Sequence, residues 1–263
     1  MSRLMLIGAH PDDCEWMGGG LAAICRRADW AVRFVSVTDG GSGHHEMKRP
    51  ALVRRRAIEA KQAAGRIGAD AINLHEPDGG VYVTPQATDK VIATIRKFKP
   101  DVLVTHRDCD YHRDHRYTAR LVLDASFVLQ VPLVCPKVKA LLSMPVILYA
   151  ADFFTEGPIF RPHLVLDTGS AIKLRTRMLF DHDSQFMEWI PWVNGDKTKG
   201  RRNRADSADI AKMLMENPRR FAERFSAELR QRYGRRVEFA EAFQISEYGR
   251  RITPSELQAL IPG

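Results

Sequence analysis

The sequence predicts an α/β protein with a mostly parallel, doubly wound sheet and helices on both of its faces. Two observations, the alternation of two kinds of segment and the size of the chain, indicate this Rossmann-like, three-layer class. Short continuous apolar runs, which are typical of strands buried on both faces, alternate with segments whose apolar residues recur at helical spacing. The chain also has 263 residues, of which 44% are hydrophobic, so it can bury a sizeable core. Such an alternation packs as a parallel sheet between two layers of helices.

Seven segments are expected to form strands, because each is a short and largely apolar run. They are 4–9, 32–38, 72–75, 102–106, 146–150, 164–167 and 239–245. We expect the last of these to lie at an edge of the sheet. In the common doubly wound order 3-2-1-4, the first and fourth strands are neighbours.

Helices are expected at 21–28, 51–67, 86–98, 115–129 and 170–182. The first follows three glycines, and the last begins at Ser170, whose side chain is a suitable N-cap. Toward the C-terminus we expect a long loop over 186–206 and then extra helices. Residues 207–232 predict a basic helix, or a helix pair that is broken near Pro218.

Length and composition narrow the class of protein. We expect a single domain over 1–263, with a core to about 185 and a basic C-terminal extension over about 186–263. No apolar run approaches the roughly 20 residues that span a bilayer. The first residues lack the pattern of a signal peptide. The 4 cysteines form no disulfide framework in a chain of this size and suit reduced thiols. We therefore expect a cytoplasmic protein.

The formal net charge of +8 lies mainly in 196–236, which holds thirteen Lys/Arg and six Asp/Glu. Two interpretations stay open for this basic segment. It can be a solvated helical face with interspersed acids, or it can bind an anionic substrate or a polyanionic partner. Nucleic acid is not an expected partner, because no nucleic-acid-binding motif is visible.

The first cluster of reactive side chains, His10-Pro11-Asp12-Asp13, directly follows the first strand. An imidazole and two carboxylates at a strand exit are costly unless they are solvated, paired or bound to a cation. His10 and Asp13 can reach one ion from a turn, and both ligand types suit zinc. The alternative is a solvated loop in which Asp12 or Asp13 caps the next helix.

The second cluster, at 106–115, has three histidines and three aspartates in ten residues. On its own, a His-x-x-His pair such as His112 and His115 is weak evidence for a metal site. The cluster, however, follows the fourth strand. Because the carboxyl ends of neighbouring parallel strands meet at one edge of a sheet, we expect the two clusters to converge there.

Together the clusters supply three ligands, His10, Asp13 and His115, and leave a fourth coordination position open, as in catalytic zinc sites. Asp12 and His112 then lie beside the metal without binding it. A carboxylate there can deprotonate water, and a cationic imidazole can stabilise an oxyanion or protonate a leaving amine. Asp114 is expected to hold His112 in its tautomer and to keep it protonated.

These motifs, with Thr38-Asp39-Gly40 at the end of the second strand, resemble the LmbE-like/PIG-L family of zinc-dependent N-deacetylases. Several members of that family act on compounds that contain N-acetylglucosamine. Further matches occur in order along the chain at Arg56-x-x-Glu59, Pro77-Asp78-Gly79, His182-x-Ser184-Gln185 and Glu241-Ala242-Phe243. The resemblance therefore extends from residue 4 to about residue 245.

The resemblance implies zinc, or another divalent metal, bound by the same three ligands. It also implies Asp12 as general base, and His112 as oxyanion stabiliser or acid with Asp114 as its partner. The chain departs from the family pattern at Cys14, where glutamate is usual, and at Arg113, where proline is frequent.

Three residues are expected to contact the substrate: Arg56, Asp39 and Tyr111. For Arg56, an ion pair on the helix surface with Glu59 or Asp70 is the alternative. Three aromatic residues leave two interpretations open, since they can form a wall for a sugar ring or anchor a long loop. They are Phe186, Trp189 and Trp192.

The function expected from the resemblance is hydrolysis of an N-acyl group, expected to be acetyl, from an amino sugar or a related small conjugate. One alternative is an amidase for a larger conjugate. The other is a module of the same fold that binds a polyanion without catalysis. A homo-oligomer is left open.

Overall fold

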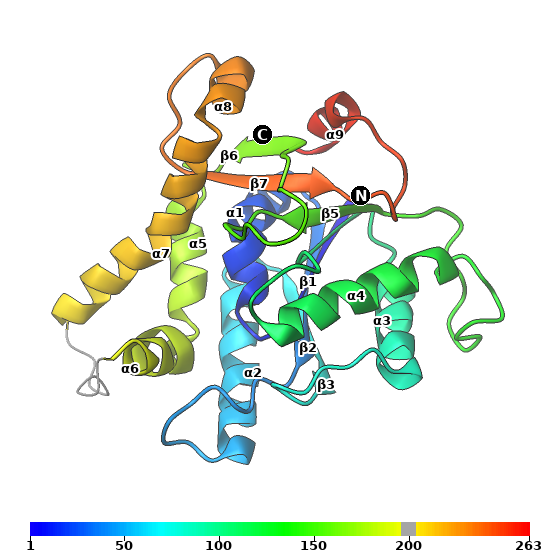
Figure 1. Cartoon of the computed structure of the whole chain (residues 1–263), viewed down its shortest axis with the longest axis horizontal. Helices are drawn as coiled ribbons and strands as arrows, with labels where there is room; N and C mark the ends of the chain where they lie inside the picture. Colours follow the sequence, from blue (N-terminus) through cyan, green and yellow to red (C-terminus); the bar gives the residue numbers. More distant parts are fainter. Residues whose placement is uncertain (196–203) are drawn as a thin grey trace.

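The computed structural model describes residues 1–195 and 204–263. In this part of the chain a seven-stranded sheet has the order β3-β2-β1-β4-β5-β7-β6 (Figure 1). The strands are β1 (Arg3–Gly8), β2 (Ala31–Thr38), β3 (Asp70–Glu76), β4 (Val102–Thr105), β5 (Val146–Ala150), β6 (Leu164–Asp167) and β7 (Ala240–Ile245). The first five are parallel. The predicted order 3-2-1-4 is confirmed.

The position of β7 corrects the sequence-based prediction of an edge strand. It lies between β5 and β6 and is antiparallel to both, pairing Ile245 with Leu148 and Ala242 with Val165. Residues 240–243 are buried, as is expected of an interior strand. The C-terminal segment therefore completes the same sheet that the first half of the chain begins (Figure 1).

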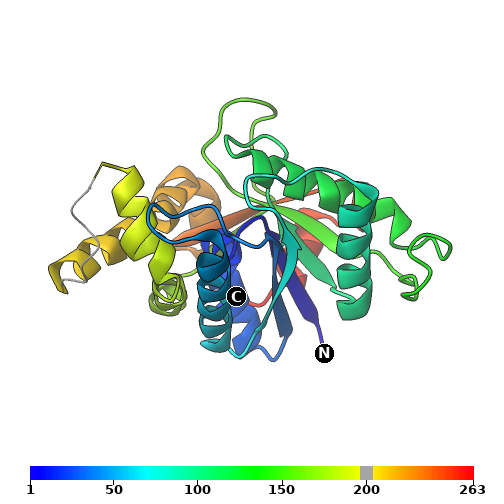
Figure 2. The ribbon, with the colours of Figure 1, turned by 90° about the horizontal axis from the view of Figure 1, so that it is seen from below.

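The helices are α1 (Asp13–Arg27), α2 (Arg49–Gly65), α3 (Pro85–Phe98), α4 (Arg113–Val128), α5 (Ile172–Phe180), the π-helix η1 (Ser184–Trp189), α6 (Ile190–Val193), α7 (Arg204–Arg224), α8 (Ser226–Tyr233) and α9 (Pro254–Leu260). Alternate residues of β1 define the two faces of the sheet. Leu4 and Leu6 pack in one core with α1, and Met5 and Ile7 pack in the other with α3 and α4. Figure 2 shows α3 and α4 on one side of the strands and α2 on the other. The three-layer α/β class is confirmed.

Helix α1 begins eight residues before the predicted start at residue 21 and passes through the glycines, with a kink at Gly18 (φ −157°). At this kink the backbone N–H groups of Gly20 and Leu21 donate to the carboxylate of Glu241, each at 2.8 Å. A carboxylate from β7 therefore satisfies donors that the kinked helix leaves unpaired. Only the folded chain brings this acceptor to the glycines.

Two further helix boundaries differ from the prediction. Ser170 does not cap α5, whose N-cap is Ala171 without a side-chain bond; the Ser170 hydroxyl instead accepts from Arg27. The predicted loop over 186–206 is partly helical, in η1 and α6, and its residues 196–203 lie outside the described part of the chain.

The predicted helix pair forms, but α7 continues through Pro218, and the break comes at Phe225. A proline within a helix leaves the carbonyl four residues earlier without its donor. Here Arg175 supplies that donor: its Nη1 lies 2.9 Å from the carbonyl oxygen of Leu214. Among the described residues no helix has both the length and the apolar character to cross a membrane.

Candidate metal-dependent active site

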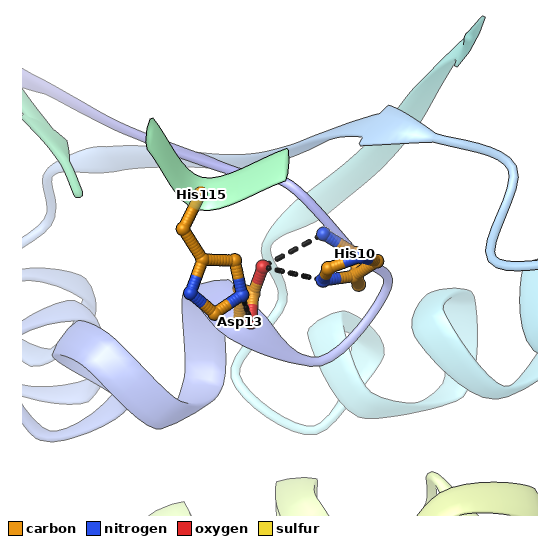
Figure 3. A group of neighbouring side chains, drawn as sticks. All are labelled: His10, Asp13 and His115. Atoms are coloured by element: carbon orange, nitrogen blue, oxygen red, sulfur yellow. Dashed lines mark hydrogen bonds and ion pairs between the residues drawn. The ribbon is translucent and has the colours of Figure 1, made fainter. Parts of the chain in front are cut away.

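The ends of β1 and β4 bring the two polar clusters together. Strands β1 and β4 are paired, so the turn at residues 10–13 faces the start of α4. Asp13 lies between the two histidines, with its Oδ2 3.3 Å from His10 Nδ1 and its Oδ1 3.5 Å from His115 Nε2. Figure 3 shows the three side chains pointing toward one another from α1, the preceding turn and α4.

The donor set fits a divalent metal. His10, Asp13 and His115 each offer a ligand atom, and these atoms lie within 4.8 Å of one another. Two imidazole nitrogens and one carboxylate oxygen form a ligand set of catalytic zinc sites.

In two other groups of side chains in the described structure, the ligand atoms also lie within 4.8 Å of one another: His10 with His112 and Asp114, and His106 with Asp110 and His115. In the second of these, the rings of His106 and His115 are stacked, with 4.1 Å between centroids and 5° between planes. The lone pairs of an imidazole lie in its ring plane, so parallel rings cannot both aim at one ion. The rings of His10 and His115 are inclined by 60°, which allows convergence.

The charges of this cluster favour a bound cation. Burial disfavours the charged form of each group. At His10 and His115, however, the nearby carboxylates raise the pKa by more than burial lowers it. Asp114, Asp13 and Asp78 raise the pKa of His10 well above its ordinary value. Asp13 and Asp110 raise the pKa of His115 to about 9. Conversely, the neighbouring His115 and His106 hold the pKa of Asp13 well below its usual range, although burial opposes this.

Asp12 lies next to this set and is paired with Arg56. Its Oδ1 accepts from Arg56 Nη2 at 2.9 Å, and the guanidinium also donates to the carbonyls of Pro11 and Gly40. Burial raises the pKa of Asp12, and the positive charge of Arg56 opposes that rise. Arg56 is only 2% exposed, which corrects the alternative of a surface ion pair.

The two partners expected for Arg56 in that alternative are engaged elsewhere. Glu59 accepts from Arg55 and from the hydroxyl and N–H of Ser184. Asp70 is bonded to Arg33.

The predicted pairing of Asp114 with the His112 ring is wrong. The Asp114 carboxylate accepts from the N–H groups of Gly79 (2.7 Å) and Val81 (3.2 Å) in the loop after β3. His112 caps α4 instead, because its Nδ1 accepts from the N–H of Asp114 at 3.1 Å. Burial and the nearby His10 and His115 lower the pKa of His112. This lowering disfavours the cationic form of His112 that is expected from the sequence.

A cavity of about 480 Å³ opens over the cluster. Arg56 and Tyr111 line it, as do Asp12 and His112. Asp39 is not among its lining residues. The Asp39 carboxylate binds Arg49 at 2.7 Å and the N–H of Gly41 at 3.0 Å. Of the predicted substrate contacts, the structure thus places Arg56 and Tyr111 at the cavity.

Three side chains that contact the ligand set have no role in the sequence-based prediction: His106, Asp110 and Asp78. Asp110 Oδ2 lies 3.1 Å from His115 Nδ1, and Asp78 Oδ1 lies 3.3 Å from His10 Nε2. Histidine ligands commonly have such a carboxylate partner. Asp78 follows β3, whose carboxyl end lies on the same edge of the sheet as those of β1 and β4. Its position after a strand that ends at this edge could therefore have predicted that Asp78 lies at the site.

Residues 5–126 match a family model described as PIG-L, GlcNAc-PI de-N-acetylase. This part of the chain is similar to the PIG-L family. The PIG-L segment contains the candidate ligands His10, Asp13 and His115, and also Asp12 and His112. In contrast, the cavity walls formed by 150–154, η1, α6 and α7 lie beyond it.

Comparison with individual proteins extends the likeness beyond the PIG-L segment. The chain is 24% identical over 200 residues to a diacetylchitobiose deacetylase of Thermococcus kodakarensis, covering 73% of this chain and 74% of that protein. Among solved structures, N,N'-diacetylchitobiose deacetylase from Pyrococcus horikoshii has a TM-score of 0.73 and 19% identity, covering 94% of this chain and 84% of that one.

A third similar protein has a different reaction. The 4-carboxy-2-hydroxymuconate hydratase GalB from Pseudomonas putida KT2440 has a TM-score of 0.76 and 18% identity, covering 96% of this chain and 98% of that one. The solved structures therefore show the fold of this protein. Since one fold hosts several chemistries, the reaction has to be argued from the site.

Proposed function

We propose that this protein is a zinc-dependent N-deacetylase that hydrolyses an N-acyl group, most simply acetyl, from an amino sugar or a related small conjugate. One observation carries the proposal. A three-residue ligand set, His10, Asp13 and His115, lies beside a buried carboxylate, Asp12, that is not part of the set. This arrangement provides a metal with an open position and a separate base, as metal-assisted amide hydrolysis requires.

The three ligands would hold the metal at the base of the cavity. When bound there, zinc supplies a Lewis acid that polarises the amide carbonyl and lowers the pKa of water. Asp78 and Asp110 orient the ligand histidines from behind, since each lies within 3.3 Å of a ring nitrogen of His10 or His115. Another divalent ion suits the same donors.

Asp12 acts as the general base. Arg56 engages its Oδ1, so Oδ2 is the oxygen that takes the proton from the attacking water. Burial raises the pKa of Asp12 toward the working range of a base, while Arg56 keeps the carboxylate ionised before the reaction. After the attack, protonated Asp12 is the donor that can deliver this proton to the leaving amine.

His112 acts as a neutral hydrogen-bond donor. Because its Nδ1 accepts from the backbone N–H of Asp114, the ring proton is assigned to Nε2. The hydrogen bond to the first turn of α4 fixes the orientation of the His112 ring. Its Nε2–H therefore needs no rearrangement when negative charge develops on the amide oxygen of the substrate. The lowered pKa of His112 supports this role over that of a cationic acid.

The substrate class rests on the PIG-L match of residues 5–126 and on the two deacetylases to which the chain is similar. Both of those proteins are named for the deacetylation of diacetylchitobiose. We propose Tyr111 and Arg56, which line the cavity, as substrate contacts.

We further propose that the chain forms a single domain, since β7 of the C-terminal extension lies between β5 and β6. A cytoplasmic location is proposed from the four free cysteines.

The test is an assay of wild-type protein, loaded with zinc, on N-acetylglucosamine and N,N'-diacetylchitobiose. Release of free amine and acetate, lost after chelation and restored by zinc, is the expected result. The same preparation is tested for hydration of 4-carboxy-2-hydroxymuconate. Hydration without deacetylation would overturn the proposal, and an amide hydrolysed equally well by Asp12→Asn would overturn the assigned base.

A further inference from the structure

The cavity has an aromatic side that begins at the candidate ligands. We define the aromatic wall as Tyr111, Phe154, Phe153 and Phe221, all of which line the cavity. The Tyr111 ring lies 5.8 Å from that of His112 and 5.7 Å from that of Phe154. Phe153 stacks on Phe221 with 4.5 Å between ring centroids and 3° between planes. The aromatic wall therefore leads from the reacting centre to α7.

Two of the three segments that supply this wall lie outside the PIG-L segment. Phe153 and Phe154 follow β5, and Phe221 belongs to α7. Strand β5 pairs with β4, so the residues after it lie next to the cluster at 106–115. Pro218, on the same turn of α7 as Phe221, also lines the cavity. The basic segment thus contributes an apolar surface to the site.

Charged groups near the aromatic wall are paired rather than directed at a ligand. Asp152 forms an ion pair with Arg107, with 2.9 Å between Nη1 and Oδ1. Arg220 lies over the face of Phe153, 3.9 Å from the ring centroid. The carbonyl of Asp152 accepts from Arg224. Phe221 and Arg220 thus cover the two faces of Phe153, and the ring surface offered at this side comes from the edge of Phe153 and from Phe154 and Tyr111.

Tyr111 is 76% exposed, although its ring adjoins the candidate ligands. An exposed aromatic ring at the mouth of a cavity is typical of a ligand contact, because a bound apolar group removes both surfaces from water. A small N-acetyl sugar that reaches only the reacting centre would leave the half-buried Phe154, which also lines the cavity, without a partner from the substrate.

We propose that the physiological substrate carries an aryl or alkyl group beside the scissile amide, and that this group packs on the aromatic wall. The proposal deepens the proposed function and rests on it. The apolar group belongs either to the aglycone of the amino sugar or to a longer acyl chain. When this group packs on the aromatic wall, the apolar surfaces of both are removed from water, which strengthens binding.

Two pairs of substrates test the proposal and separate its two sources. The phenyl and methyl β-glycosides of N-acetylglucosamine vary the aglycone, and N-hexanoyl- and N-acetylglucosamine vary the acyl chain. We expect the apolar member of at least one pair to have a kcat/KM higher by roughly tenfold or more. Equal values within both pairs would overturn the proposal.

Variants locate the effect. Phe154→Ala and Phe153→Ala should remove most of the preference for the apolar member, while leaving the kcat/KM of its small counterpart within about threefold. Phe127→Ala is the matched control, because Phe127 is an exposed aromatic residue of α4 that does not line the cavity. If the preference persists in both cavity variants, or is lost in the control, the apolar group does not bind on the aromatic wall.

A binding measurement distinguishes failure of this inference from failure of the proposed function. Calorimetry compares the phenyl and methyl β-glycosides of glucosamine, which lack the amide and need no turnover. If no amide is hydrolysed but the phenyl glycoside binds roughly tenfold more tightly, the wall is supported and the deacetylase is not. Equal affinities, together with equal kcat/KM values, would count against the wall.

Discussion

Arg175 donates a hydrogen bond of 2.9 Å to the carbonyl of Leu214, the carbonyl that Pro218 leaves without its helical donor. The same guanidinium donates to the carbonyl of Trp16 at 2.8 Å, near the kink of α1. It also lies 3.4 Å from the Glu241 carboxylate, which binds the N–H groups on the far side of that kink. One buried ion pair thus joins the irregular points of two helices, and both helices border the cavity.

Arg175→Met should destabilise the fold by about 3–5 kcal/mol, because Glu241 would be left charged and buried without its partner. In that background, Pro218→Ala should recover about 1 kcal/mol, since the N–H of residue 218 can then donate to Leu214. Urea unfolding of the two single variants and the double variant measures the coupling. Strictly additive free energies would mean that Arg175 does not serve as the substitute donor.

Asp12→Asn should lower kcat by about 10²- to 10⁴-fold, because the substituted amide cannot accept the proton from water. Metal content, measured by elemental analysis, should stay at the wild-type level, since Asp12 is outside the ligand set. Asp108→Asn is the matched control: Asp108 lies in the same polar run but forms an exposed ion pair with Arg120. If Asp12→Asn also lost the metal, its role would be that of a ligand.

His10→Ala and His115→Ala should each lose the metal. A ligand that binds only the folded state raises the free energy of unfolding, by about 2.7 kcal/mol at a free concentration of 100 times Kd. Zinc should therefore raise the Tm of chelator-treated wild type and leave these two variants unchanged. His75→Asn, at an exposed histidine outside the cavity, should respond as wild type does. A zinc-induced rise in His115→Ala would argue for another ligand set.

His182 should make stability depend on pH. It is buried, with Nε2 3.3 Å from Glu15 Oε1. Burial opposes its charged form, but Glu15 outweighs this and raises the pKa of His182 in the folded protein. The stabilisation is therefore fully present below the ordinary histidine pKa of about 6.5 and is lost as pH rises through the raised value.

The free energy of unfolding of wild type minus that of His182→Gln measures this contribution between pH 6 and pH 9. The difference should be largest at pH 6 and should fall toward alkaline pH. A constant or rising difference would mean that the buried histidine is neutral in the folded state throughout this range.

Much of the fold follows from local patterns in the chain. Continuous apolar runs such as 4–9 and 102–106 identify buried parallel strands, and the order of the first four strands follows from their alternation with helices. The pattern cannot place β7, because its neighbours, β5 and β6, lie about 75 to 95 residues earlier in the chain. Nor can it show that α1 runs through three glycines, since the acceptor at the kink, Glu241, comes from β7.

The site divides in the same way. The sequence by itself determined that His10, Asp13 and His115 would approach one another, because parallel strands that are neighbours end at the same edge of a sheet. The tertiary structure decided which carboxylate faces which imidazole. The Asp114 carboxylate binds N–H groups of the loop after β3, and His112 caps α4.

The aromatic wall, too, exists only in the folded chain, since Tyr111, Phe153 and Phe221 come from three separate segments. The physical reason is the distance along the chain over which each kind of interaction acts. Side-chain periodicity and strand order act over a few residues or a single strand–helix unit, and they leave a readable pattern. Partners chosen among segments a hundred residues apart depend on packing and on the pairing of buried charges, which only the assembled fold determines.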